Sequence, residues 1–405
     1  MSLSTKAIRS KAADPMNIQH RIFAAIGIGA FIICVLACRP SFSPDGKKVV
    51  FPVFDAKTKQ TSVMLYDRET RRLESIFTRP AQNDVVYAAT VWTPDGKHVV
   101  IATIEGEEAG DKSKRPFMVA GPFMVAVLSV DRKGPTRFLH VPGNPGMMGL
   151  YHQPPIIGKH MFLGGESGIT RLDLETGEIK TATVTQGPAS ENSENLSVFG
   201  KCERLYYFVD KKEVVEIGTV DPETLRCQAL LEIGKNEGSE FSGFPAVTKD
   251  GTRIALAVGK ENQRILIYRG GVLEGTLAVG TTDEPINIGN LLWSSDEKLI
   301  YAAHLKPAGE GKVECGFCEI PLSGAKLRKT PLCVLEKYNA PGVPFEIALS
   351  PDGKCIAAST ANFVGRSIDV ENPALYLVDL TRAKRPVTKI PVSKLKSVKS
   401  GAKVP

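Results

Sequence analysis

The chain has 405 residues, of which 42% are hydrophobic and 23% are charged, as in an ordinary soluble globular protein. This composition excludes a disordered chain, a collagen-like chain and a protein with many membrane spans. The formal net charge of +7 lies at the ends, because residues 1–37 carry +3 and residues 382–405 carry +8, which leaves −4 for residues 38–381. The basic C-terminal stretch contains no aromatic residue on which a base could stack, so we expect no nucleic-acid partner.

The first predicted element is an apolar helix at the N-terminus. Residues 22–37 form a run of 16 uncharged residues, which is typical of a secretory signal and shorter than the ~20 residues of a membrane-spanning helix. The run leads into Val35-Leu36-Ala37-Cys38, which resembles the lipobox of bacterial lipoproteins. We therefore expect residues 1–37 to be a cleaved signal or an uncleaved anchor helix, and Cys38 to be lipidated.

This signal places the protein in the cell envelope, on the periplasmic or cell-surface side, held at a membrane through its N-terminus. Met16 opens a more compact signal than Met1 does, so we also predict that translation starts at Met16. The alternative is a cytoplasmic protein in which the apolar run is a buried helix.

A turn phrase of the form Ser/Thr-Pro-Asp-Gly then recurs along the chain. Proline presets the backbone of such a turn, aspartate accepts hydrogen bonds from nearby amides, and glycine adopts the positive φ that returns the chain. Each copy leads into a short segment rich in Val and Ile, which indicates a strand. The complete copies contain Asp45-Gly46, Asp95-Gly96 and Asp352-Gly353, and the reduced copies contain Asp250-Gly251 and Asp296-Glu297.

Two degraded copies at Gly158 and Gly200 complete the series. The spacings between the seven markers are 50, 62, 42, 51, 46 and 56 residues, so the unit is about 51 residues long. Each unit holds two further strand signals after the marked strand, which predicts a four-stranded antiparallel sheet. We therefore predict an all-β, seven-bladed β-propeller over residues 38–393, almost no helix after Cys38, and a basic disordered tail over residues 394–405.

The turn phrase before a Val/Ile-rich strand resembles the WD-like propeller repeat of the TolB family. The resemblance implies a propeller fold and little about function, because similar blades serve scaffolds, peptidases and sugar-active enzymes. TolB proteins also carry an N-terminal α/β domain, for which there is no room between Cys38 and Pro40. A TolB role is therefore not carried over.

No residue pattern of the chain predicts catalysis, a cofactor or a metal. The G-x-S-x-G elbow of propeller-linked peptidases is absent, since Gly165-Glu166-Ser167-Gly168 has the wrong spacing. His140, His152 and His304 lack a ligand spacing, although two of them could face one end of the channel. The alternative to a non-enzymatic reading is a lyase or lactonase acting on a glycan or lactone, and it predicts that these histidines converge with acidic residues.

The cysteines after the signal suggest a bridge rather than a redox motif. Cys315-Gly316-Phe317-Cys318 lies in a predicted strand, which directs its two thiols to opposite faces. The turn at residues 322–325 places Cys333 opposite residue 314 or 315, so a Cys315–Cys333 disulfide is feasible in an oxidising compartment.

Taken together, these patterns predict an exported, lipid-anchored propeller that binds a protein or carbohydrate partner or acts as a scaffold. We expect a monomer. The first strand of a blade begins, and the fourth ends, on the same face of the disc, so a lipidated Cys38 would hold this face close to the membrane. The basic tail leaves from the same face and could contact anionic lipid.

Overall fold

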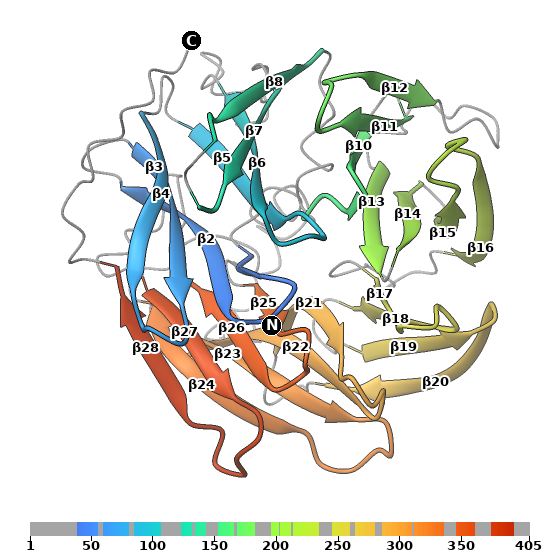
Figure 1. Cartoon of the computed structure of the whole chain (residues 1–405). Helices are drawn as coiled ribbons and strands as arrows, with labels where there is room; N and C mark the ends of the chain where they lie inside the picture. The colour runs from blue at the N-terminus through green and yellow to red at the C-terminus, as the bar shows by residue number, and fades with distance from the viewer. Residues whose placement is uncertain are drawn as a thin grey trace, which may run out of the picture.

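The computed structural model describes residues 39–55, 60–80, 85–106, 123–131, 134–142, 153–165, 168–182, 196–201, 203–211, 214–234, 245–259, 264–279, 286–309, 312–335, 346–360 and 374–392. All regular elements in these ranges are β-strands, and they form seven four-stranded antiparallel sheets. The sheets are arranged in a ring as the blades of a propeller (Figure 1). The predicted fold class is confirmed for this part of the chain.

Each blade is built from four consecutive strands, numbered here from the centre of the ring outward. Blades 1 to 4 comprise β1 (Ser41–Phe42), β2 (Lys48–Asp55), β3 (Gln60–Asp67) and β4 (Leu73–Pro80); β5 (Val85–Trp92), β6 (His98–Gly106), β7 (Phe123–Ser129) and β8 (Arg137–Val141); β9 (Ile156–Ile157), β10 (His160–Gly165), β11 (Gly168–Asp173) and β12 (Ile179–Ala182); and β13 (Leu196–Lys201), β14 (Arg204–Asp210), β15 (Val214–Val220) and β16 (Cys227–Gly234). Blades 5 to 7 comprise β17 (Ala246–Val247), β18 (Arg253–Val258), β19 (Arg264–Arg269) and β20 (Val272–Ala278); β21 (Asn287–Trp293), β22 (Leu299–Pro307), β23 (Val313–Pro321) and β24 (Arg328–Leu335); and β25 (Ile347–Leu349), β26 (Cys355–Ser359), β27 (Ala374–Asp379) and β28 (Val387–Pro391).

The antiparallel order gives the disc two different faces. We call the face at which the first strand of each blade begins the start face, and the opposite one the turn face. The connections from first to second strand and from third to fourth strand lie on the turn face. The connections between blades lie on the start face, and so does the end of β28, as predicted.

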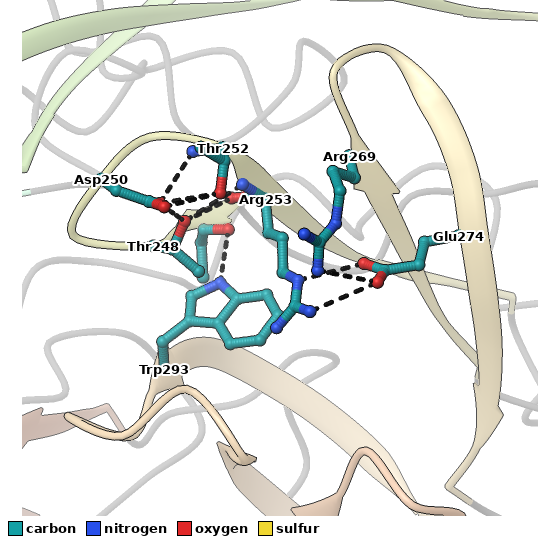
Figure 2. A network of polar contacts seen from close by, with 8 residues as sticks. Thr248, Asp250, Thr252, Arg253, Arg269, Glu274 and Trp293 are labelled. Carbon is teal, nitrogen blue, oxygen red and sulfur yellow. Dashed lines mark hydrogen bonds and ion pairs between the residues drawn. The ribbon is translucent and has the colours of Figure 1, made fainter.

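The predicted turns form as expected on the turn face. Gly46, Gly96, Gly251 and Gly353 all have φ between 69° and 76°, and Glu297 takes the same conformation at 56°. Ser43 shows the hydrogen bonding: its hydroxyl donates to Asp45 Oδ1 at 2.6 Å and accepts the Lys48 amide at 2.9 Å. Thr248 and Asp250 make the equivalent contact in blade 5 at 2.7 Å (Figure 2).

One predicted marker is misplaced by three residues. Gly200 does not have a positive φ, because it lies within β13 and pairs with Leu205 of β14. The left-handed residue of this turn is Glu203, at φ 64°. A Cβ on Gly200 would lie 2.5 Å from Pro155 of blade 3, so this glycine is required by close packing rather than by the turn.

A second repeated turn, which the sequence analysis missed, joins the third and fourth strands. Aspartate Oδ1 accepts the two amides that follow it at positions +2 and +3 in three blades. These turns read Asp-x-Glu-Thr in the sequence, at residues 67–70, 173–176 and 221–224. This repeated motif could have been recognised from the sequence alone.

The core is divided among the blade interfaces. Successive residues of a strand point to opposite faces of a blade, so Val49 packs into the cluster shared with blade 7 and Val50 into the cluster shared with blade 2. Both faces of each blade are thus covered, which explains why the second strands read as continuous apolar runs. Among the described residues there are seven such clusters, one for each interface.

The ring is closed between blade 7 and blade 1 by side-chain packing. Each described sheet contains only consecutive strands, so no strand is shared across this junction. Phe51 and Leu375 lie in the cluster that joins the two blades. On the turn face the ring of Pro351 lies 3.5 Å from the position of a Cβ on Gly46, just as Pro44 lies 3.5 Å from that of Gly96.

The predicted N-terminal helix, Cys38 and the basic tail over residues 394–405 lie outside the described residues. Among the residues that the structure does describe, no helix is long and apolar enough to span a membrane.

Candidate functional site

Two residues of opposite charge lie just before the innermost strands of blades 1 and 7. Arg39 and Glu346 lie four residues before Ser43 and Ser350, the residues that open the turns of blades 1 and 7. The two positions are therefore equivalent in neighbouring blades of the ring. Glu346 is only 6% exposed, and its carboxylate and the Arg39 guanidinium attract one another.

Burial perturbs both groups of this pair. Loss of water raises the pKa of Glu346 to about 7, and the Arg39 charge reduces the shift. Burial also lowers the pKa of Arg39, opposed by the charge of Glu346. The Arg39 Nε has no hydrogen-bond partner within the described structure. The pair thus holds hydrogen-bonding capacity that its own contacts do not use up.

Asn290 occupies the same position in blade 6, four residues before Ser294. Its Nδ2 donates to the Ile347 carbonyl at 2.7 Å, and its Oδ1 accepts the Ile347 amide at 3.0 Å. The β21–β22 register shifts between Ile288 and Leu291, which places Asn290 in a bulge. Because Ile347 directly follows Glu346, this two-bond contact fixes the backbone that carries the carboxylate.

Gln153 contacts the backbone beside Arg39. Its Nε2 lies 3.1 Å from the Arg39 carbonyl, 3.2 Å from the Pro40 carbonyl and 3.1 Å from the Thr90 carbonyl. A side chain from the start of blade 3 thus reaches the innermost strands of blades 1 and 2. Thr90 itself is fully buried, and its hydroxyl has no partner among the described residues.

These residues, Arg39, Thr90, Gln153, Asn290 and Glu346, are called the axial cluster below. It combines a cation, a carboxyl group, two amides and a hydroxyl on or just before the innermost strands of five blades. A carboxyl group with a pKa of about 7 can donate or accept a hydrogen bond near neutral pH. The arrangement is suited to hold a polar group that both donates and accepts.

The sequence analysis did not identify Arg39, Asn290 or Glu346. Their residue types differ, so no repeated letter marks the position. Aligning the repeats on the turn serine would have placed all three at one level of neighbouring blades. The shared position of these three residues could therefore have been recognised from the sequence.

Of the histidines named from the sequence, the two that the structure describes lie in different blades. His140 is exposed on the outermost strand of blade 2, and His304 is buried in blade 6, 3.5 Å from Cys318 Sγ. His152 lies outside the described residues. No group of three or more His, Cys, Asp or Glu side chains that could hold a metal is found in the described part of the chain.

The predicted cysteine geometry is confirmed. Cys315 packs in the cluster shared with blade 7, whereas Cys318 packs in the one shared with blade 5, so the two thiols point to opposite faces. Cys315 is the direct register partner of Cys333 across β23 and β24. Both are free thiols in this structure, and the disulfide itself remains a prediction.

Comparison with known proteins defines the fold and leaves the function open. No protein-family profile matches the sequence, and no curated protein matches it. Among solved structures, the chain is similar to KlAtg21 in complex with the coiled coil of AgAtg16, with a TM-score of 0.51, 15% identity, and coverage of 88% of this chain and 98% of that one. A putative 6-phosphogluconolactonase from Bacteroides fragilis gives a TM-score of 0.50 and 14% identity, covering 85% and 93%.

TolB from Acinetobacter baumannii is also among the similar structures, with a TM-score of 0.43, 14% identity, and coverage of 71% of this chain and 64% of that one. Identities this low show a shared fold alone. The chain is a seven-bladed propeller whose function has to be argued from its own residues.

Proposed function

We propose that the protein is an exported, lipid-anchored β-propeller that binds a protein or carbohydrate partner through the centre of its start face. The observation that carries the proposal is the axial cluster, where the buried Glu346 and the partly exposed Arg39 attract one another. Burying a charge costs several kcal/mol, and burying apolar residues of similar volume is often as stable or more so. A binding role accounts for charges that stability alone does not require.

The chemistry of the cluster favours a polar partner group. The guanidinium offers donors, the carboxyl group offers a donor or an acceptor, and the Thr90 hydroxyl offers both. Sugar hydroxyls and backbone amides are groups of this kind. A partner on the start face would meet the partly exposed Arg39 side chain first.

The position of Cys38 supports an anchor on the same face. It directly precedes Arg39, so a lipid on Cys38 would hold the start face close to the membrane. The partner we propose is therefore itself a component of that membrane or lies on its surface.

The anchor is tested by labelling cells with palmitate. The full-length wild-type protein should incorporate label and sediment with membranes, and the Cys38→Ser variant should not incorporate it. An unlabelled wild-type protein in the cytosol would refute export and lipidation together. Binding is tested separately, by isolating wild type and Glu346→Gln from solubilised membranes: we expect a partner that wild type retains and the variant loses.

One observation favours the alternative, an enzyme acting on a glycan or lactone. A carboxyl group with a pKa of about 7 is suited to general acid–base catalysis at neutral pH. If Glu346 has this role, Glu346→Gln should retain the ligand and lose turnover, whereas in a binding module it should lose the ligand.

A further inference from the structure

Two cysteines of blade 6 lie opposite one another, and the proposed function uses neither of them. Cys315 lies on β23 and Cys333 on β24, at directly paired positions. Each thiol shifts the pKa of the other. The register shifts just after this pair, between Cys315 and Gly316, so a bulge borders the position.

The two cysteines differ in access. Cys315 is fully buried, whereas Cys333 lies on the outermost strand and is partly exposed. A reagent in solution would therefore reach Cys333 first. Cys315 lies directly opposite Cys333 on the neighbouring strand.

Blade 7 supplies groups that favour a thiolate at Cys333. The pKa of Cys333 is lowered first by Cys315, and burial opposes this shift; the Tyr376 hydroxyl and the Lys389 ammonium lower it as well. Lys389 also lies 5.9 Å above the Tyr376 ring, which keeps both groups on the same side of blade 6. The pKa of the buried Cys315 is raised instead.

We propose that Cys333 and Cys315 are an attacking and a resolving thiol that close a disulfide across β23 and β24 when they meet a small-molecule disulfide. The Cys333 thiolate attacks one sulfur of the oxidant, forms a mixed disulfide and releases the first thiol. Cys315 then gives up its proton and attacks Cys333 Sγ, which releases the second thiol. Two protein thiols are oxidised and one oxidant disulfide is reduced to two thiols.

The chemistry goes beyond the proposed function, because it depends only on the packing of blades 6 and 7. Its occurrence in the cell rests on the proposed export, since disulfides persist in oxidising compartments. Purified protein in defined redox buffers therefore tests the thiol pair separately from export. If no disulfide forms in these buffers, the thiol pair is refuted. If the disulfide forms there but the cysteines are reduced in cells, export is refuted.

The experiment treats the purified full chain with oxidised glutathione and maps the cysteines by mass spectrometry. Wild type should lose two hydrogen atoms and give a peptide cross-linked between Cys315 and Cys333. Cys318→Ser is the matched control, because this thiol is also fully buried in β23 but points to blade 5; it should form the same bridge. Absence of the bridge in wild type, or its replacement by another pairing, would overturn the proposal.

The order of attack is tested with single variants. Cys315→Ser should accumulate glutathione on Cys333, and Cys333→Ser should accumulate none on Cys315. If Cys315→Ser does not fold, brief labelling of reduced wild type with N-ethylmaleimide replaces it, and Cys333 should react at least tenfold faster than Cys315. Equal rates, or preferential modification of Cys315, would contradict the assigned roles.

Discussion

At the residue scale, Glu346 is the side chain with the clearest consequence for pH. Its pKa in the folded protein, about 7, lies above the ordinary value of 4.5. The folded state thus holds a proton that the unfolded chain has lost, so the free energy of unfolding falls as pH rises from about 4.5 to about 7. The difference in pKa corresponds to roughly 3 kcal/mol.

Replacing Glu346 by glutamine should remove this slope. We expect urea denaturation of Glu346→Gln between pH 4.5 and 7 to give a flatter profile than wild type. Glu69→Gln, at an exposed carboxylate on the turn face, is the control and should keep the wild-type slope. An unchanged profile in Glu346→Gln would mean that the carboxyl group is hydrated.

The turn aspartates give a second prediction at this scale. Asp95 accepts the Thr93 hydroxyl at 2.6 Å and the Lys97 amide at 3.0 Å, and these bonds lower its pKa. Asp95→Ala should cost about 1 kcal/mol at pH 7. The loss should fade as pH falls through the lowered pKa, because the wild-type carboxylate is then protonated too. Lys97→Ala, which leaves both bonds in place, should stay near wild type in the same denaturation series.

At the element scale, indole donors join neighbouring innermost strands. Trp92 Nε1 donates to the Ser41 carbonyl and Trp293 Nε1 to the Ala246 carbonyl, each at 3.0 Å (Figure 2 shows Trp293). Blade 1 has Phe42 at the equivalent position, so a phenyl ring fits there. The bond rather than the ring is what a Trp→Phe change removes.

Trp92→Phe and Trp293→Phe should therefore each cost about 1–3 kcal/mol, since a buried carbonyl loses its donor. Urea denaturation of the two variants measures this cost. A loss well below 1 kcal/mol in both would show that the carbonyls find other partners.

The elements also show what the sequence could predict. The turn phrase located most blades because the turn needs particular residues: proline, aspartate and a residue tolerant of positive φ. The turn of blade 4 could not be located in this way, because Glu203 adopts the left-handed conformation in place of a glycine. The axial cluster was not predicted either, because Arg39, Asn290 and Glu346 share a position in the repeat but not a residue type. The bulge at Asn290 has no sequence signal.

At the scale of the whole molecule, the ring is closed without a shared strand. Its stability then depends on every interface alike, including the one between blades 7 and 1. Leu375 in that interface and Leu172 in the one between blades 2 and 3 are both fully buried. Truncation of either to alanine should cost about 2–5 kcal/mol and shift one common transition. A separate early transition in Leu375→Ala alone, seen by calorimetry, would show that the closure opens independently.

The two faces of the disc also make the binding proposal testable by position. Ala308 is exposed at the start-face end of blade 6, and Lys97 is exposed on the turn face of blade 2. Either residue can be replaced by a photo-cross-linking amino acid in the full-length protein within living cells.

Ultraviolet cross-linking from these two positions is the most direct test of a binding module that works through its start face. We predict a discrete adduct from Ala308, none from Lys97, and a several-fold lower yield from Ala308 when Glu346 is changed to glutamine. An adduct from Lys97 alone, or an Ala308 adduct unaffected by Glu346→Gln, would contradict the account.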